Sequence, residues 1–382
     1  MTRAGADPEK STRGATVRRD ARCCVSTGRV MSLFTYMNES KKGNFSDEVQ
    51  EVAGERMEKK PPTIEEIQEW LEKENPLGFF RDREFTIVDI DPKAWSGHFN
   101  FLVDVGGKKM VLRWKGPEWG EPVQGIVNEY RTLEAIGQYH VGPNVYDLIE
   151  NFFGEPALLE EYLEGESLSA MPEQVQAQLY PDVARLICRI NQIPVEVDRI
   201  PFRRAITSYE PVKKKWRSRL DVILENPYTK LAGEKIEELL PPADRMLDAF
   251  EPRLKRVLEQ YGPAFIFESA HSGHCLRTAD GVKFLNWENV SYGDPSYTLA
   301  VFLASIADWP DSPQRRKEMI GVYLEQHPIE EFRELVDQRL DEREVSNLIW
   351  SVWSHAYRGV EKTLDLSSSR RYEKVRRVLS ER

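Results

Sequence analysis

Apolar residues between positions 85 and 162 come in short runs that predict strands. Three runs are rich in β-branched and aromatic residues: Phe85 to Ile90, Phe99 to Val105 and Met110 to Trp114. Gly106-Gly107 separates the second run from the third and is typical of a two-residue hairpin turn. We therefore expect three antiparallel strands, followed by two more at Val145 to Asn151 and Ala157 to Tyr162.

Two helices accompany these strands. Thr63 and Glu66 follow two prolines and form a capping box, in which each side chain bonds a backbone N–H group of the other residue. The helix that begins there ends at Asn75-Pro76, because a proline restricts the residue before it. A second helix is expected from about Pro122 to Gly137, with the glycine as its C-cap.

Beyond Gly165 the pattern becomes largely helical. A β-rich stretch from Ala264 to Asn286 interrupts it and predicts a small hairpin. Residues 1–60 show no sustained period, so we expect a disordered arm, with Met31 and Met37 as alternative translation starts. The predicted helices span 171–192, 211–225, 234–260, 313–326, 329–339, 342–362 and 369–380.

This layout indicates an α+β protein with two lobes. Residues 61–163 would form a small antiparallel sheet with a helix before it, and residues 164–382 a mainly helical lobe. The net charge of −10 over 382 residues disfavours nucleic acid as a partner. No run of about 18 apolar residues predicts a membrane span. None of the four cysteines has CxxC spacing, so we expect a reducing, cytoplasmic setting.

Two motifs in register lie between Phe265 and Ala300. They are Leu285-Asn286-Trp287-Glu288 and the segment from Tyr292 to Tyr297, which reads YGDPSY. With the strands and helix upstream, they resemble the aminoglycoside phosphotransferase and choline kinase family over roughly residues 80–360. The resemblance implies a protein-kinase-like fold that holds ATP between its lobes.

The resemblance assigns nucleotide-binding roles in the small lobe. Arg113 stands where many kinases carry a lysine that contacts the phosphates, and Glu129 resembles the helix glutamate that pairs with that cation. Gly97 lies in a segment that resembles the loop over the phosphates. Glu161 and Leu163 fall in a segment that resembles the hinge, whose backbone would bond adenine.

The chain departs from the family at the positions that carry the chemistry. Aligned with the family's His-Gly-Asp, the chain reads Glu268-Ser269-Ala270, so the position of the catalytic base is Ala270. The two positions that ligate the metal in the family are Cys275 and Asn286 here. Magnesium prefers carboxylate oxygen, so the sequence argues against a strong magnesium site.

Other polar side chains near the vacant position could substitute for the base. Glu268, His271 and His274 are the candidates, although loop polarity alone explains their presence. A zinc site from His271, His274 and Cys275 would lack a well-spaced fourth ligand. The basic run from Lys213 to Arg217 is interpreted as a solvated helix face. The aromatic residues Trp350, Trp353 and Tyr357 are interpreted as core.

We expect a pseudokinase that binds a nucleotide or another small molecule, or a protein partner, with little phosphoryl transfer. The first alternative is an active ATP-dependent small-molecule kinase that uses Glu268, His271 or His274 as its base. The second is an interaction scaffold that binds no nucleotide. The acceptor substrate is not encoded in any motif recognised here.

Overall fold

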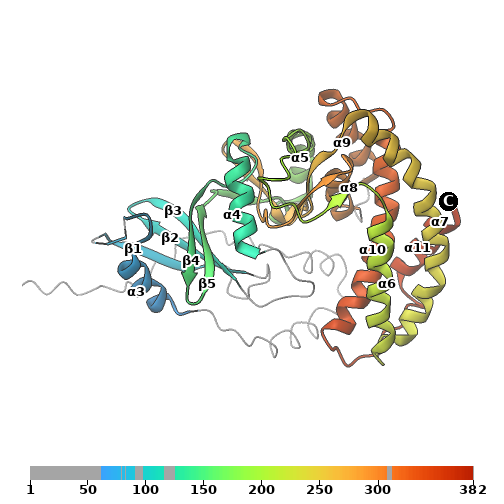
Figure 1. The fold of residues 1–382 in the computed structure, drawn as a ribbon, viewed down its shortest axis with the longest axis horizontal. Coiled ribbons are helices and arrows are strands. Elements are labelled where there is room, and N and C mark those ends of the chain that lie inside the picture. Colours follow the sequence, from blue (N-terminus) through green and yellow to red (C-terminus); the bar gives the residue numbers. More distant parts are fainter. Residues whose placement is uncertain are drawn as a thin grey trace, which may run out of the picture.

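The computed structural model describes residues 62–78, 80–81, 83–90, 98–115, 125–307 and 312–381. The predicted arm over 1–60 and Gly97 lie outside these ranges. The chain forms two lobes, with the blue and green strands gathered in one and the long helices in the other, as Figure 1 shows.

The small lobe contains the five predicted strands in one antiparallel sheet. Their order across the sheet is β1-β2-β3-β5-β4, so β4 and β5 exchange places relative to their order in the sequence. All five predictions are confirmed to within two residues at each end. The strands are β1 (Phe85–Asp89), β2 (His98–Val105), β3 (Lys108–Lys115), β4 (Val145–Phe152) and β5 (Glu155–Glu161).

Helices cover both faces of this sheet. Helix α3 (Ile64–Glu74) begins at the predicted capping box, and its buried residues pack with Leu112 and Leu159. Helix α4 (Gly125–Ile136) shares a second core with Leu158 instead. Successive residues of a strand point to opposite faces, so Arg113, next to Leu112, points toward the face that α4 covers.

The second lobe is mainly helical. Two helices predicted over 329–339 and 342–362 are one continuous helix, because the charged residues Arg339 and Glu342 pair with each other along it and are buried. Helix α8 was not predicted: it is apolar on all sides and fully packed, so it shows no period. The helices are α5 (Glu173–Asn191), α6 (Glu210–Glu225), α7 (Lys230–Tyr261), α8 (Tyr297–Ser305), α9 (Ser312–Gln326), α10 (Phe332–Tyr357) and α11 (Arg370–Glu381).

Short strands interrupt the helices of the second lobe. The predicted hairpin forms, but the β-rich stretch extends beyond its predicted end at Asn286 to Gly293. Two three-stranded sheets result, with orders β10-β9-β6 and β7-β11-β8. The strands are β6 (Gly165–Ser167), β7 (Ala205–Ile206), β8 (Ala264–Phe267), β9 (Cys275–Thr278), β10 (Gly281–Phe284) and β11 (Val290–Gly293). Single turns of 3₁₀ helix lie at Pro76–Gly78, Gly137–Tyr139, Leu168–Ala170 and Ser272–His274.

A glycine allows the lobes to approach each other closely. A Cβ atom at Gly142 would lie 2.4 Å from the indole Nε1 of Trp287, so a larger residue would displace that ring. The buried Trp287 stacks on Phe267 and thereby fixes the loop that follows β10. Across the described parts of the chain, no helix combines the length and apolar character needed to cross a bilayer.

Candidate functional site

Two loops of the helical lobe meet beside the small sheet. Residues 268–274 connect β8 to β9, and residues 285–289 connect β10 to β11. Two backbone hydrogen bonds join these loops: the N–H of Leu285 donates to the carbonyl of His274 at 2.9 Å, and that of Glu268 to Asn289 at 3.0 Å. The motif residues noted in the sequence therefore lie together in space.

The predicted pair between Arg113 and Glu129 forms. The guanidinium Nε of Arg113 lies 2.8 Å from a carboxylate oxygen of Glu129, and both side chains are buried. The other carboxylate oxygen of Glu129 accepts a hydrogen bond of 2.8 Å from the backbone N–H of Trp287. One carboxylate therefore contacts a strand of the small lobe and a loop of the helical lobe.

Arg113 also contacts the residue at the second metal-ligand position. Its Nη2 donates a hydrogen bond to the side-chain oxygen of Asn286 and lies 3.1 Å from Nδ1 of His98. Asn286 has a φ of 68°, a left-handed conformation that asparagine tolerates better than most residues. The oxygen that would face a metal ion in the family faces an arginine here.

The donor set does not fit magnesium. Cys275 is fully buried, and burial raises the pKa of its thiol, so the sulfur stays protonated at neutral pH. The oxygen of Asn286 is an uncharged amide already bonded to a cation. Among the residues with described positions, no three His, Cys, Asp or Glu side chains gather as a metal site would require.

Three carboxyl groups surround Arg113, a cluster that the sequence did not predict. They are Glu129, Glu160 and Glu288, and each is buried. Burial, with the charge of Glu129, raises the pKa of Glu160 to about 8. Burial likewise raises the pKa of Glu288 to about 7, although Arg113 opposes the shift. One guanidinium does not hold three carboxylates ionised at neutral pH.

The position of the family's catalytic base holds no polar group. Ala270 is fully buried. Glu268, two residues earlier, lies 2.5 Å from Nη2 of Arg204 and accepts a hydrogen bond from Ser291. Burial raises the pKa of Glu268, but Arg204 and Ser291 outweigh it and the net pKa is lowered. Glu268 is thus a stably ionised ion-pair partner with little tendency to accept a proton.

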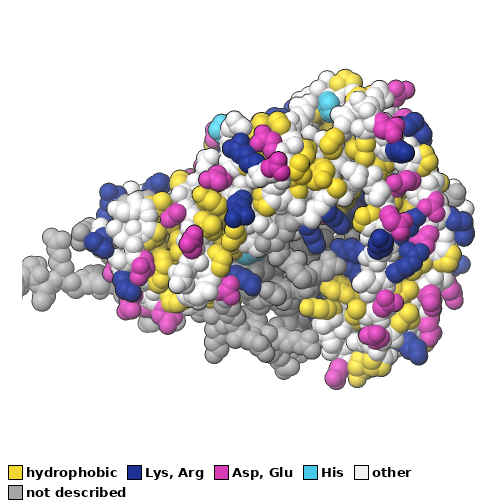
Figure 2. Space-filling view, viewed as in Figure 1, with side chains coloured by type: hydrophobic (Ala, Val, Ile, Leu, Met, Phe, Trp, Pro, Cys, Tyr) yellow, Lys and Arg dark blue, Asp and Glu magenta, His cyan; other side chains and the backbone are white. Residues whose placement is uncertain are grey.

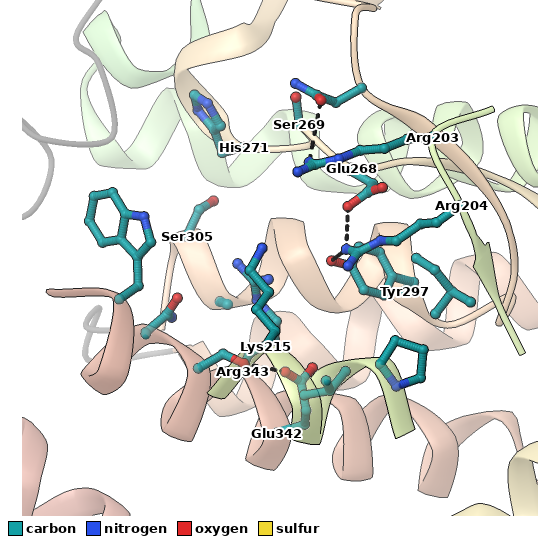
Figure 3. Close-up of a pocket in the computed structure, with 18 of the residues that line it drawn as sticks. Arg203, Arg204, Lys215, Glu268, Ser269, His271, Tyr297, Ser305, Glu342 and Arg343 are labelled. Carbon is teal, nitrogen blue, oxygen red and sulfur yellow. Dashed lines mark hydrogen bonds and ion pairs between the residues drawn. The ribbon is translucent and has the colours of Figure 1, made fainter. Parts of the chain in front are cut away.

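The two histidines of this loop lie against each other. Their ring centroids are 3.7 Å apart, and His274 contacts the carbonyl of Ser269 at 3.1 Å through Nδ1. Burial lowers the pKa of both, to about 4 for His274, so both rings are neutral at pH 7. His271 lines the adjoining cavity, as Figure 3 shows.

The hinge-like segment has its own contacts. The N–H of Glu161 donates to the carbonyl of Asn144 at 2.8 Å, and its carboxylate accepts from the backbone and side-chain nitrogens of the same residue. Leu163 is buried. These contacts fix the path of the chain between the lobes, and the assignment of Glu161, Leu163 and Gly97 to nucleotide binding stays a prediction.

A cavity of about 430 Å³ opens on the helical-lobe side of the 268–274 loop. Figure 2 shows Lys and Arg side chains inside the hollow between the lobes, next to the helices. Most of these cations were missed in the sequence, because they come from segments far apart in the chain. The charged residues of the lining are Arg203, Arg204, Lys215, Arg219, Arg343 and Arg371, with the carboxylates Glu268 and Glu342.

Two sequence interpretations change here. The basic run is only partly a solvated face: Lys213 and Arg217 pair with Asp248 and Asp244 of α7, whereas Lys215 enters the cavity. The aromatic residues of α10, all interpreted as core, also differ in their surroundings. Trp353 is buried and Tyr357 is exposed, but Trp350 lines the cavity.

The fold is shared with known small-molecule kinases. A choline kinase from Cryptosporidium parvum Iowa II superposes with a TM-score of 0.58 and 17% identity, covering 84% of this chain and 96% of that one. A spectinomycin phosphotransferase solved with ADP and spectinomycin gives a TM-score of 0.51 and 10% identity, covering 84% and 98%. The predicted protein-kinase-like α+β fold is thereby confirmed.

Sequence comparison gives the family. A thiamine kinase from Escherichia coli O6:K15:H31 (strain 536 / UPEC) is 21% identical over 224 residues, which span 59% of this chain and 66% of that enzyme. A model of the phosphotransferase enzyme family matches residues 92–334, which contain both loops and the Arg113–Glu129 pair. The chain belongs to the phosphotransferase enzyme family.

Proposed function

We propose that this protein is a pseudokinase of the phosphotransferase family that binds a nucleotide without needing magnesium. The observation that carries the proposal is the hydrogen bond from Arg113 to Asn286. A guanidinium provides a positive charge and fixed donors for phosphate oxygens. Arg113 therefore supplies, at the metal-ligand position itself, part of the charge neutralisation that a metal ion gives an active kinase.

The catalytic loop supports weak phosphoryl transfer. Ala270 accepts no proton, and loss of a general base costs about 10²–10⁴ in rate. Glu268 is held ionised by Arg204 and is a poor replacement. Without a suitable donor set for magnesium, the charge that develops on a transferring phosphoryl group also lacks its usual partner.

A calorimetric titration with ATP tests the proposal. We expect ATP affinities with and without magnesium to differ by less than about tenfold, or 1.4 kcal/mol. Arg113→Lys, which keeps the charge but loses the fork of donors, should weaken binding, whereas the exposed Arg131→Lys on α4 should not. A gain of about a hundredfold on adding magnesium would refute metal independence.

One observation favours the alternative of an active kinase. His271 lines the cavity beside the vacant base position and is neutral, although burial lowers its pKa and makes it a weak base toward a hydroxyl group there. ATP turnover of about 1 per second or faster with a hydroxyl compound, lost in His271→Gln, would establish this reading over the pseudokinase. If the protein neither binds nor turns over ATP, the result would favour the second alternative, an interaction scaffold that binds no nucleotide.

A further inference from the structure

The cavity beside the 268–274 loop has a charge opposite to that of the whole protein. The chain carries a net charge of −10, yet six cationic side chains and only two carboxylates line this space. We propose that the cavity binds a small organic phosphate. The inference rests on the proposed function in one respect: it takes this side of the cleft as the one where a kinase of the family would bind its acceptor substrate. Binding of a phosphate in the cavity requires no nucleotide.

The cations converge from four separate elements. Arg203 and Arg204 precede β7, and Lys215 and Arg219 lie on α6. Arg343 comes from α10 and Arg371 from α11. Figure 3 shows Arg203 and Arg204 approaching from the strand side, and Lys215 and Arg343 from the helices opposite. Such convergence concentrates positive potential in a space with low-dielectric walls.

The two carboxylates of the lining already have partners. Glu268 pairs with Arg204 and accepts from Ser291. Glu342 pairs with Arg339, which does not line the cavity, and accepts from Ser346. Glu342 acts on Arg204 through its charge as well, so the two carboxylates offset two of the six cations and a surplus of positive charge remains.

Two donors near the cavity are unused. The Nε atoms of Arg204 and Arg343 are buried and make no hydrogen bond to any residue in the described part of the chain. A buried donor without a partner is costly, so these two side chains gain from any shift that lets their Nε atoms reach an oxygen. Arginine presents its donors as a planar fork that suits phosphate oxygens.

The positive charge and the volume of the cavity favour some anions over others. A phosphate monoester carries about −1.5 to −2 charges at pH 7, against −1 for a carboxylate, and so matches the surplus of cations better. The volume of about 430 Å³ is that of a metabolite-sized site. Trp350 and His271 supply flat surfaces for an uncharged part of the ligand. Cationic compounds such as choline would meet like charges here.

Calorimetry on the full chain tests this with glycerol 3-phosphate and glucose 6-phosphate as probes. Glycerol, glucose, citrate, choline and kanamycin serve as comparisons. We expect the phosphate esters to bind, with affinity that falls as NaCl rises from about 50 to 500 mM, and the other compounds to bind at least tenfold more weakly. Lys215→Gln and Arg343→Gln should each weaken the phosphate esters about tenfold.

Matched controls lie on the same two helices. Lys214→Gln on α6 and Arg333→Gln on α10 each remove one exposed cation outside the lining and should leave affinity unchanged. Equal effects of cavity and control variants would overturn the proposal, as would preferential binding of choline or kanamycin. Citrate binding alone would show an anion site that is not for phosphate esters.

The same variants separate this inference from the proposed function. ATP is itself an organic phosphate and could enter the cavity. A nucleotide bound in the cleft responds to Arg113→Lys and not to Lys215→Gln, and the reverse holds for a ligand of the cavity. If one of the two binding tests fails, the other therefore still gives an interpretable result.

Discussion

The guanidinium of Arg113 donates a hydrogen bond to the amide oxygen of Asn286, which joins the third strand of the small sheet to the loop after β10. The same guanidinium pairs with Glu129. In the family that this chain resembles, an aspartate would stand at position 286. Here the neutral amide leaves Arg113 with one ionised neighbour fewer, which keeps its positive charge available to an anion.

Asn286→Asp should weaken metal-free ATP binding by about tenfold, because a new carboxylate would both consume the charge of Arg113 and repel phosphate oxygens. Magnesium should recover only part of that loss, since the protonated thiol of Cys275 supplies no oxygen ligand. Titration of the variant with ATP, with and without magnesium, measures both effects. Full recovery by magnesium would show that other groups complete a metal site.

Rebuilding the whole family motif should cost stability. Cys275 and Ala270 are fully buried rather than exposed to a solvated cleft, so the chain should not easily accept polar replacements there. Cys275→Asn should lower the free energy of unfolding by ~1–3 kcal/mol, the cost of a buried amide without partners. Chemical denaturation checks this, with Cys275→Ser as the smaller polar control. An unchanged midpoint would mean that the amide finds partners.

Glu129→Ala should destabilise the fold strongly. It removes the partner of the buried Arg113, and breaking a buried ion pair in this way costs ~3–5 kcal/mol. Glu134→Ala on the same helix is exposed and should change the stability by less than ~0.5 kcal/mol. Equal denaturation midpoints for the two variants would contradict the role given to Glu129.

The stability of the protein should fall as the pH rises above about 7.5. Glu160 and Glu288 have pKa values raised to about 8 and about 7 from 4.5, so the folded state holds more protons than the unfolded state in that interval. The histidines with lowered pKa values, His271, His274, His327 and His355, act oppositely, and their effect is nearly complete about one pH unit above the ordinary value of 6.5. Above that pH the carboxyl contribution outweighs theirs.

Thermal unfolding from about pH 7.5 to 9 measures this slope. Glu160→Gln keeps the shape of the protonated side chain and removes its titration, so the fall in melting temperature should become shallower. Glu155→Gln, on the same strand but partly exposed, is the matched control. A steeper fall in Glu160→Gln would reverse the assignment of the protonated state.

The local pattern was enough to predict the sheet, and the resemblance to the family supplied its central ion pair. Strand parity and the apolar face of α4 both place Arg113 and Glu129 at one surface, so their contact follows from neighbouring elements. The cavity cations are different. Arg203 and Arg343 are 140 positions apart in the sequence, and only tertiary packing, of α6 against α10 and of β7 against β11, brings such residues together.

The continuous helix α10 shows a second limit of prediction from the sequence. The sequence predicted two helices here, over 329–339 and 342–362, although the charged residues Arg339 and Glu342 are buried in one continuous helix, which is rare for charged residues. In the structure Asp294, Glu342 and Arg339 satisfy one another inside the lobe. Pairing of this kind depends on residues distant in the sequence, and periodicity does not record it.

The two bonds of Glu129 have a mechanical consequence. One oxygen is held by Arg113 of the sheet and the other by the backbone of Trp287 in the opposite lobe. Pulling the lobes straight apart would break the hydrogen bond from the N–H of Trp287 to this carboxylate, whereas rotating them about the carboxylate would keep it. We therefore expect the lobes to rotate relative to each other about Glu129 rather than to separate. Such a rotation would open the outer part of the cleft for ligand exchange and keep the part next to Glu129 closed.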